Sequence, residues 1–543
     1  MLYIRIPERA ERLECAKHLQ QPIDFNFTPP KNMKKYPLML SALALLMNCA
    51  HSETLDEQLL RKYALKSFPE YLELLTLPNV STLPGDHLVT NAKWLKSSFE
   101  KRGFKIVMAE NKNHPLVLGE LMPHQPQKKT ILYYLHFDGQ PLINSQWSQE
   151  DPFKPVLKKR AANGNWEVVN MGELMKVDFD PELRLFGRST SDDKGPIGMF
   201  LASLDMIQTE GMKLGNNVKI ILDSEEEISS PGIASVVEHH KDFLRSDAVV
   251  ILDAAAHPSG RPNLVFGNRG VVTLTLTMHG PKVPLHSGHY GNYIPNPAMN
   301  LVQLLASMKD AHGRVTIPGY DSTTKLSADD LRVLHATGDD EALVKRRAGI
   351  AQPDEVAPSY GESLQYPSLN IRGLSSGGVG ASAANIIPKD AVAEIDIRTT
   401  QEANASYLVD LIKKHIEKEG FHILDHAPND EERAMFAKIV QLRVGASSEA
   451  ARQSLESPIR FWGERALRDA FAGLPSSPQP VLIRAMGATV PTYEIVSPLK
   501  IPFFLMPNVN SDNNQHAFDE NLRMGNYLFG MRQITGLLST SYP

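Results

Sequence analysis

Histidine and carboxylate side chains recur along this chain directly after apolar segments. His136 and Asp138 follow the apolar run 130–135, and Asp253 follows the run 248–252. Further candidates are Asp192, Asp193, Glu225, Glu226, Glu227 and, near the C-terminus, His516. Imidazole and carboxylate groups are ligands that zinc prefers, and paired zinc ions activate water for hydrolysis. The residue types therefore predict a two-zinc hydrolase site.

Each of these signals is weak when taken alone. A single histidine at a strand end is more often a structural polar residue, and a run such as Glu225–Glu227 is usually a solvated loop. Asp253 has the ordinary alternative of a helix N-cap or turn residue. The functional interpretation rests on the order of the candidates and on their shared placement after apolar runs.

The elements that position these residues alternate between strand and helix. Apolar runs that favour strands lie at 104–109, 130–135, 218–222 and 248–252, and helical patterns lie at 196–210 and 232–245. This alternation predicts an α/β fold with a mostly parallel sheet covered by helices on both faces. Because ligands bind at the carboxyl ends of strands in such sheets, the candidate residues are expected to converge.

The pattern changes after Gly270. Alternating segments at 271–278 and 391–397 predict antiparallel strands, helices are predicted at 297–311 and 405–419, and 312–370 and 425–480 read as loop-dominated. A strand at 503–506 and a closing helix at 520–538 complete the chain. We predict an N-terminal extension with a signal peptide (1–52), a catalytic domain in two parts (53–267 and 486–543) and an inserted α+β lid or dimerisation domain (268–485).

Taken together, the motifs resemble those of one known family. They are His136-x-Asp138, Gly187-Arg188-x-x-Ser191-Asp192-Asp193-Lys194-Gly195, Glu226-Glu227, Asp253 and His516-x-x-x-Glu520. This set is similar to the dizinc metallopeptidases that include carnosinase-like dipeptidases, glutamate carboxypeptidase, aminoacylase, acetylornithine deacetylase and succinyl-diaminopimelate desuccinylase. The resemblance extends from about residue 55 to the C-terminus.

The resemblance implies a role for each residue of the site. Asp192 would bridge two Zn²⁺ ions, with Mn²⁺ or Co²⁺ as alternatives, and a cis peptide would link it to Asp193. The remaining ligands would be His136 with Asp253 on one ion and Glu227 with His516 on the other. Glu226 would be the general base and Asp138 would orient His136. These roles agree with the chemistry, since a free carboxylate beside a ligand can accept the proton of water.

The inserted segment adds candidates for substrate binding. By the same resemblance, His286 would reach the site of a neighbouring subunit and stabilise an oxyanion, and Asn385 would donate to the substrate carbonyl. Arg398 would grip a terminal carboxylate, a task that suits its planar guanidinium. Gly487 and Thr489 are assigned to substrate binding as well. Met486 stands where dipeptidases of the family carry a glutamate, which favours a neutral or bulkier acyl side of the substrate.

Length, charge and cysteine usage limit the class of protein. A chain of 543 residues is expected to form two or more domains. The net charge of −5, without a basic stripe, gives no reason to expect binding to nucleic acid. The only cysteines are Cys15 and Cys49, so the chain after residue 52 has no thiol for disulfides or catalysis.

The N-terminal segment has the pattern of a secretory signal. A basic start at Met33 precedes about ten apolar residues and a small-x-small site near Ser52. This pattern predicts a secreted or periplasmic enzyme without a stable membrane span, and a translation start at Met33. Lipid anchoring through Cys49 is an alternative. Removing residues 1–52 takes away seven Lys/Arg and four Asp/Glu and changes the net charge from −5 to −8.

The sequence therefore predicts a homodimeric dizinc peptidase that cleaves the amide bond of a dipeptide or another small peptide. Deacylation of an N-acyl amino acid, or a glutamate carboxypeptidase-like reaction, is the alternative within this class. A non-catalytic periplasmic peptide-binding protein is the alternative outside it. The presence of Glu226 favours catalysis, because loss of the base would be the signature of a binding protein.

Overall fold

A computed structural model describes residues 55–474 and 478–543. Its main element is an eight-stranded sheet with the order β1-β2-β7-β3-β8-β20-β9-β19. The strands are β1 (Phe104–Ala109), β2 (Leu116–Leu121), β3 (Thr130–His136), β7 (Asn217–Asp223), β8 (Ala248–Ile251), β9 (Asn263–Val265), β19 (Val481–Ile483) and β20 (Phe503–Leu505). The central strands β7, β3, β8 and β20 run parallel, which confirms the predicted α/β class.

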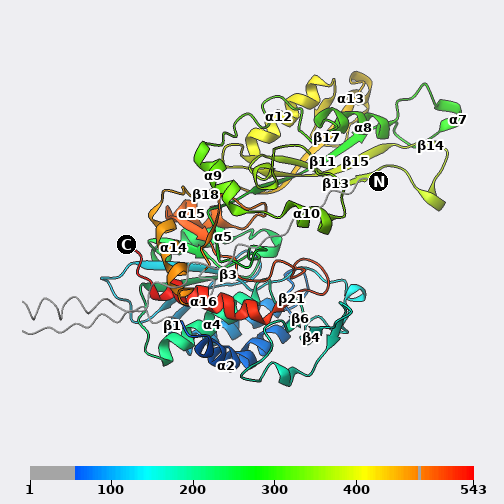
Figure 1. Ribbon diagram of the computed structural model, residues 1–543. Helices are drawn as coiled ribbons and strands as arrows, with labels where there is room; N and C mark the ends of the chain where they lie inside the picture. Colours follow the sequence, from blue (N-terminus) through cyan, green and yellow to red (C-terminus); the bar gives the residue numbers. More distant parts are fainter. Residues whose placement is uncertain (1–54, 475–477) are drawn as a thin grey trace, which may run out of the picture. The chain divides into compact units, whose positions relative to one another are not determined.

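Helices cover both faces of this sheet (Figure 1). One face packs against α2 (Glu57–Thr76), α3 (His87–Glu100), α4 (Lys194–Thr209), α14 (Pro458–Ala470) and α16 (Met524–Ser539). The other face packs against α5 (Ile233–His239), α6 (Lys241–Leu244) and α15 (Thr492–Leu499). The seven residues of β3 are all buried, as expected for a strand with helices on both sides.

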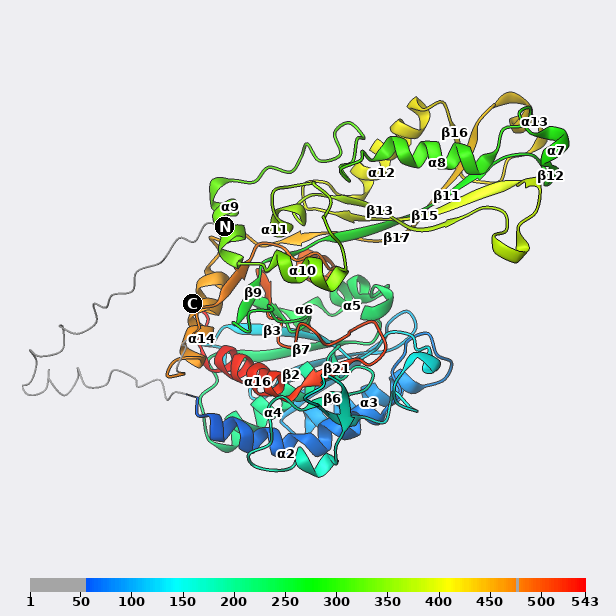
Figure 2. The same ribbon diagram turned by 45° about the vertical axis from the view of Figure 1, so that its right-hand side comes forward.

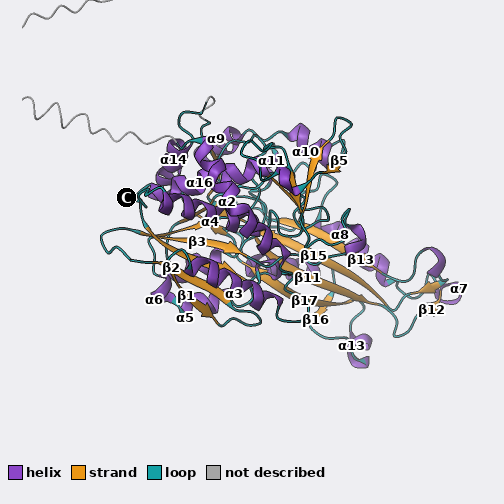
Figure 3. Ribbon diagram, turned by 90° about the horizontal axis from the view of Figure 1, so that it is seen from below, coloured by secondary structure: helices purple, strands orange, loops and turns teal. Residues whose placement is uncertain are grey.

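The inserted segment builds a second sheet with the order β13-β15-β11-β17-β16. Its strands are β11 (Gly270–His279), β13 (Ser368–Ser375), β15 (Asp390–Thr399), β16 (His422–Leu424) and β17 (Ile439–Ser448). Buried and half-buried residues alternate along β11 and β15. The buried residues pack against α8 (Pro297–Met308) and α12 (Ala405–Lys418). Figure 2 shows both helices beside the long strands, and Figure 3 shows α8 next to β13 and β15 from below. The half-buried residues form the opposite face of the sheet.

Smaller elements complete the described chain, and Figure 2 shows several of them from a second direction. A four-stranded sheet has the order β21-β6-β4-β5. Its strands are β4 (Val156–Arg160), β5 (Trp166–Val168), β6 (Arg184–Phe186) and β21 (Asn521–Arg523). The remaining elements are β10 (Gly267–Asn268), β12 (Leu285–His286), β14 (Ile386–Ile387), β18 (Ala451–Arg452), α7 (Ser287–Tyr290), α9 (Ala328–Thr337), α10 (Glu341–Ala348), α11 (Tyr360–Ser363) and α13 (Asp430–Met435).

The prediction of a loop-dominated segment at 425–480 is wrong. It contains the ten-residue strand β17 and the helix α14. The helix begins with proline at its first turn, and buried Trp462 and Leu467 join the core beneath the large sheet. Helix α14 packs against the large sheet, and β19 is one of the strands of that sheet. We therefore propose that the insert ends before α14 rather than at residue 485.

The predicted signal peptide at 33–52, together with Cys49 and the rest of the 1–52 extension, lies outside the described residues. Among the helices that the structure describes, none combines the length and the apolar character needed to span a bilayer.

Candidate metal centre and substrate cleft

The carboxyl ends of three neighbouring parallel strands carry the first candidate residues. His136 is the last residue of β3 and lies opposite Asp223, the last residue of β7. Asp253 follows β8 by two residues, and Glu226 begins a short 3₁₀ turn (Glu226–Ile228) after β7. Because β3 lies between β7 and β8, these loops emerge at one edge of the sheet.

The two carboxylate oxygens of Asp192 face two different histidines. Oδ1 lies 2.9 Å from Nε2 of His136, and Oδ2 lies 3.2 Å from Nε2 of His516. Each histidine has a second acidic neighbour: Oδ2 of Asp253 is 3.9 Å from His136 Nε2, and Oε2 of Glu227 is 3.2 Å from His516 Nε2. The structure thus brings together all five residues predicted as ligands, with Asp192 between the two pairs.

Glu520 fixes the loop that carries Asp192. Its Oε1 accepts the backbone N–H groups of Ser191 and Asp192, both at 3.0 Å, and also the Ser191 hydroxyl. Its Oε2 accepts hydrogen bonds from Arg188 Nη1 at 2.8 Å and from the backbone of Ser189 at 2.9 Å. Glu520 is completely buried, so these five donors satisfy a carboxylate that would otherwise be costly to bury.

Asp138 links a predicted ligand to the predicted base. Its Oδ1 lies 3.3 Å from Nδ1 of His136, the nitrogen that faces away from Asp192. The same oxygen accepts the backbone N–H of Glu226, and Oδ2 accepts that of Glu227, both at 3.1 Å. One buried carboxylate therefore orients the imidazole and also holds the turn that carries both glutamates.

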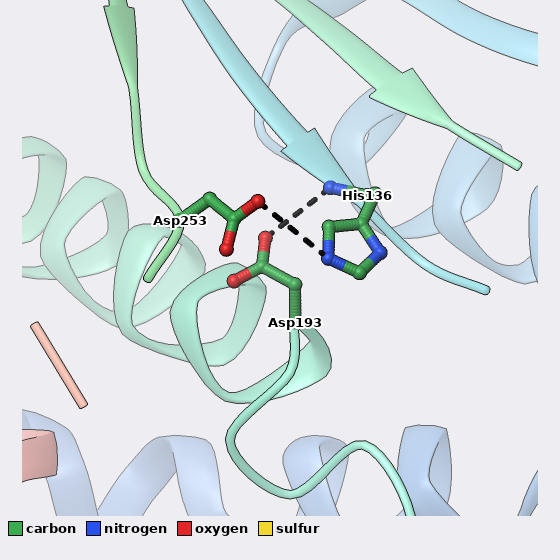
Figure 4. Close-up of side chains that lie close together, drawn as sticks. All are labelled: His136, Asp193 and Asp253. Atoms are coloured by element: carbon green, nitrogen blue, oxygen red, sulfur yellow. Dashed lines mark hydrogen bonds and ion pairs between the residues drawn. The ribbon is translucent and has the colours of Figure 1, made fainter. Parts of the chain in front are cut away.

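Asp193 also lies close to His136 and Asp253, as Figure 4 shows. Its Oδ2 accepts the backbone N–H of His136 at 3.2 Å, so this oxygen is already engaged in supporting the strand end. The ring nitrogen of His136 instead meets Asp192 at 2.9 Å. This difference favours Asp192, rather than Asp193, as the carboxylate shared between two ions. The peptide bond between the two aspartates is cis.

The centre holds a buried excess of negative charge. Burial raises the pKa of Asp253 to about 6 and that of Glu227 to about 7, and the charge of Asp192 adds to both shifts. Hydrogen bonds to Asp192 and Glu227 raise the pKa of the His516 imidazole to about 11. Buried carboxylates repel one another unless cations compensate them. Two groups of three His, Asp and Glu side chains with converging ligand atoms therefore fit two metal ions.

A cavity of about 530 Å³ opens beside this centre. Its walls include Glu226, Glu227 and His516 from the metal side and Arg398 and Thr489 from the other side. Nη1 of Arg398 donates a hydrogen bond to the Thr489 hydroxyl at 2.8 Å. Two of the predicted substrate-binding residues thus share one cavity with the predicted base.

The structure does not bring the other predicted substrate residues to this cavity. His286 and Asn385 are exposed neighbours at the small antiparallel sheet of β12 and β14, where the Ser287 N–H donates to the Asn385 carbonyl at 3.0 Å. Gly487 is not among the residues that line the cavity and lies against Leu364. Met486 packs against the core between the large sheet and α5, so its side chain does not line the cavity either.

Several residues that support the centre had no role assigned to them from the sequence. Gln140 donates to Glu227 Oε2 at 2.6 Å and also lines the cavity. Glu225, the first residue of the acidic triplet, is completely buried and accepts hydrogen bonds from Asn111 and Asn113. Gln140 follows Asp138 by two residues, and this position beside the His136-x-Asp138 motif could have indicated its role. The asparagines lie in a polar loop that is distant in sequence from Glu225, and the sequence of that loop gave no signal of such a role.

Comparison with known proteins points to one family. Residues 266–423 match the family model of the M20 peptidase dimerisation domain. The chain is 25% identical over 491 residues to the Cys-Gly metallodipeptidase of Schizosaccharomyces pombe, an alignment that covers 88% of this chain and 94% of the relative. It is 24% identical over 424 residues to the human Beta-Ala-His dipeptidase, with 77% and 76% covered.

The fold of this chain is also similar to that of solved protein structures. An M20 family metallo-carboxypeptidase from Sulfolobus solfataricus superimposes with a TM-score of 0.71 at 23% identity, covering 88% of this chain and 99% of that chain. At 23% identity, the similarity to this structure is evidence for the fold alone. The evidence for the chemistry is the metal centre of this chain.

The comparisons contradict the prediction of a secreted or periplasmic enzyme. The fungal Cys-Gly metallodipeptidases that align with most of this chain are cytosolic. A basic start followed by about ten apolar residues is a short compositional pattern, and by itself it does not specify export. The prediction of localisation, with its lipid-anchored alternative at Cys49, was therefore wrong.

The order of the motifs, the two groups of metal-binding side chains and the match to the dimerisation domain agree with the relatives. The chain is therefore similar over most of its length to the M20 metallopeptidases, and its metal centre and its relatives together identify it as a metal-dependent hydrolase of peptide bonds.

Proposed function

We propose that this chain is a metal-dependent dipeptidase that hydrolyses small peptides with a free C-terminal carboxylate. One observation carries this proposal: a single cavity of about 530 Å³ contains Glu226, Glu227 and His516 on one side and Arg398 with Thr489 on the other. A cavity of this volume holds a small ligand rather than a folded protein. The relatives whose names specify dipeptidase activity support the same substrate class.

The ligand set we propose follows the contacts of Asp192. His136 and Asp253 would hold one ion, Glu227 and His516 the other, and Asp192 would bind both. When bound, two such ions lower the pKa of a shared water and polarise the scissile carbonyl. Nitrogen and oxygen ligands suit Zn²⁺, and Mn²⁺ or Co²⁺ are alternatives.

We assign proton transfer to Glu226. Burial, together with the charges of Asp253 and Glu227, raises the pKa of its carboxyl well above the ordinary value. A carboxylate with a raised pKa is a better acceptor for the proton of the attacking water, and it can return that proton to the leaving nitrogen. Asp138 would hold Glu226 in place through the backbone hydrogen bond at 3.1 Å.

Arg398 and Thr489 would bind the terminal carboxylate of the substrate. The hydrogen bond between them fixes one edge of the guanidinium and leaves its other donors available to the cavity. A planar guanidinium pairs bidentately with a carboxylate, which gives both affinity and orientation.

His286 and Asn385 would act on the site of a second subunit. Both are exposed and lie outside the cavity of their own chain, so a role in catalysis requires a partner copy. The match of residues 266–423 to a dimerisation domain supports such a pairing. We therefore propose a homodimer in which the β12–β14 sheet of each subunit completes the neighbouring site.

A substrate panel with a matched variant tests the proposal. The wild-type enzyme, supplied with Zn²⁺ or Mn²⁺, should cleave dipeptides such as Cys-Gly or Beta-Ala-His, and the Glu226→Gln variant should lose roughly 10²–10⁴-fold in kcat while it retains both ions. Cleavage of N-acetyl amino acids but not of dipeptides would replace the proposal with a deacylase. A variant with unchanged kcat would refute the assignment of the base.

A further inference from the structure

Arg269 is a buried guanidinium without a hydrogen-bond partner. It lies between β10 and β11, and only 7% of its surface is exposed. Its Nε and Nη2 atoms are buried and meet no acceptor among the residues that the structure describes. Buried arginines are ordinarily paired with carboxylates or carbonyls, because a buried cation without compensation is costly.

A small cavity adjoins Arg269 at the base of the insert. Its volume is about 20 Å³ for water-sized contents, and its wall includes two further arginines. Both of these are compensated: Arg452 pairs with Glu402, and Arg484 pairs with Asp330 at 2.6 Å. Arg484 also donates to the Gln365 side chain at 2.7 Å. Arg269 is thus the uncompensated cation among the charged groups of this wall.

The charges nearest to Arg269 beyond the cavity do not neutralise it. Asp396 lies within electrostatic range but forms no ion pair with Arg269, and one of its own oxygens is buried without a partner. Arg398 adds a second positive charge. Burial, followed by the repulsion from Arg398, lowers the pKa of Arg269 to about 10, so the guanidinium remains protonated at neutral pH.

We propose that this cavity binds a small monovalent anion of halide size, held by the free donors of Arg269. A space of roughly 10–15 Å³ holds one water molecule, so the cavity admits a single small ion and excludes a peptide or a nucleotide. The bound anion supplies the missing negative charge beside Arg269. This site does not depend on the proposed dipeptidase activity.

Crystals of the wild-type protein grown in sodium bromide test the site directly. The proposal predicts an anomalous bromide peak within hydrogen-bond distance of Arg269 Nε or Nη2. A cavity that contains only water under these conditions, with no anomalous peak, overturns the proposal.

Thermal unfolding in solution provides a second test. At constant ionic strength, replacing gluconate by chloride should raise the Tm of the wild type saturably, on the order of 1–3 °C, because the anion binds only the folded state. The rise should disappear in Arg269→Gln and persist in Arg372→Gln, which removes a half-exposed guanidinium of the same inserted sheet. An equal rise in Tm in the wild type and in Arg269→Gln would refute the site. If Arg269→Gln fails to fold, the bromide experiment on the wild-type protein still decides whether the anion binds.

Discussion

Asp138 accepts the backbone N–H of Glu226 at 3.1 Å and faces Nδ1 of His136 with the same carboxylate oxygen at 3.3 Å. A ligand candidate on β3 and a base candidate after β7 are therefore positioned by one side chain. This geometry explains why the centre needs a carboxylate two residues beyond the histidine, where either oxygen can accept a hydrogen bond.

Asp138→Asn should disturb both the ligand and the base. An amide offers one oxygen in place of two, so it cannot accept from the imidazole and from both glutamate N–H groups. We expect metal affinity or kcat to fall roughly 10–100-fold, as for other groups that orient metal ligands. Metal titration and steady-state kinetics measure the two effects. Asp247→Asn, at the other end of the sheet, is the control, and an Asp138→Asn enzyme with unchanged constants would refute the role.

Arg398→Met should separate binding of the substrate carboxylate from catalysis. Loss of a charge-assisted, bidentate contact should raise KM for a dipeptide roughly 10–100-fold. The same dipeptide with an amidated C-terminus should bind weakly to the wild type and should be affected little by the variant. Equal effects of the substitution on the acid and the amide would contradict a carboxylate contact.

His286 should act across the dimer. His286→Ala and Asp192→Ala are each expected to be inactive as pure proteins. Mixed dimers contain one site with both intact residues, so random exchange of subunits should restore about a quarter of wild-type activity. If the mixture stays inactive although exchange is demonstrated by mass, His286 does not act in trans.

The strand ends were predictable from sequence because continuous apolar runs such as 130–135 mark buried parallel strands, and the polar residue that ends each run is conspicuous. The role of Glu520 was harder to predict from the sequence. It was visible as part of a motif, but its five hydrogen bonds depend on a long-range contact between β6 and β21, more than 300 residues apart in sequence.

Regions with weak local patterns were predicted less well. Strand β17 is exposed in its second half, so the alternation that marks β11 and β15 is absent there. The placement of Met486 also escaped prediction. Its backbone bridges to Asn268, and this contact turns the side chain toward the core rather than the cavity. Such contacts depend on tertiary packing, which the local sequence does not encode.

The ion pairs of Arg102 should make stability depend on pH. Arg102 Nη2 lies 2.6 Å from Glu70 Oε2 and 2.7 Å from Asp205 Oδ2. Burial alone would raise the pKa of Glu70, but hydrogen bonds from Arg102 and Ser98 outweigh it and lower the pKa below the ordinary value of 4.5. The stabilisation is therefore complete above that value and is lost as the pH falls through the lowered pKa.

Urea unfolding between pH 7 and pH 3 tests this dependence. Glu70→Gln should be less stable than the wild type at pH 7, and the difference should shrink as Glu70 becomes protonated in acid. A difference that stays constant over this range would show that Glu70 does not contribute through its charge.

Metal content tests the central claim most directly, since the account depends on Asp192 serving two ions. Protein dialysed with Zn²⁺ and analysed by plasma mass spectrometry should contain two ions per chain in the wild type. Folded Asp192→Ala should contain close to none, whereas Asp151→Ala, a control at a surface turn, should retain both. A folded Asp192→Ala protein that keeps two ions would contradict the shared ligand.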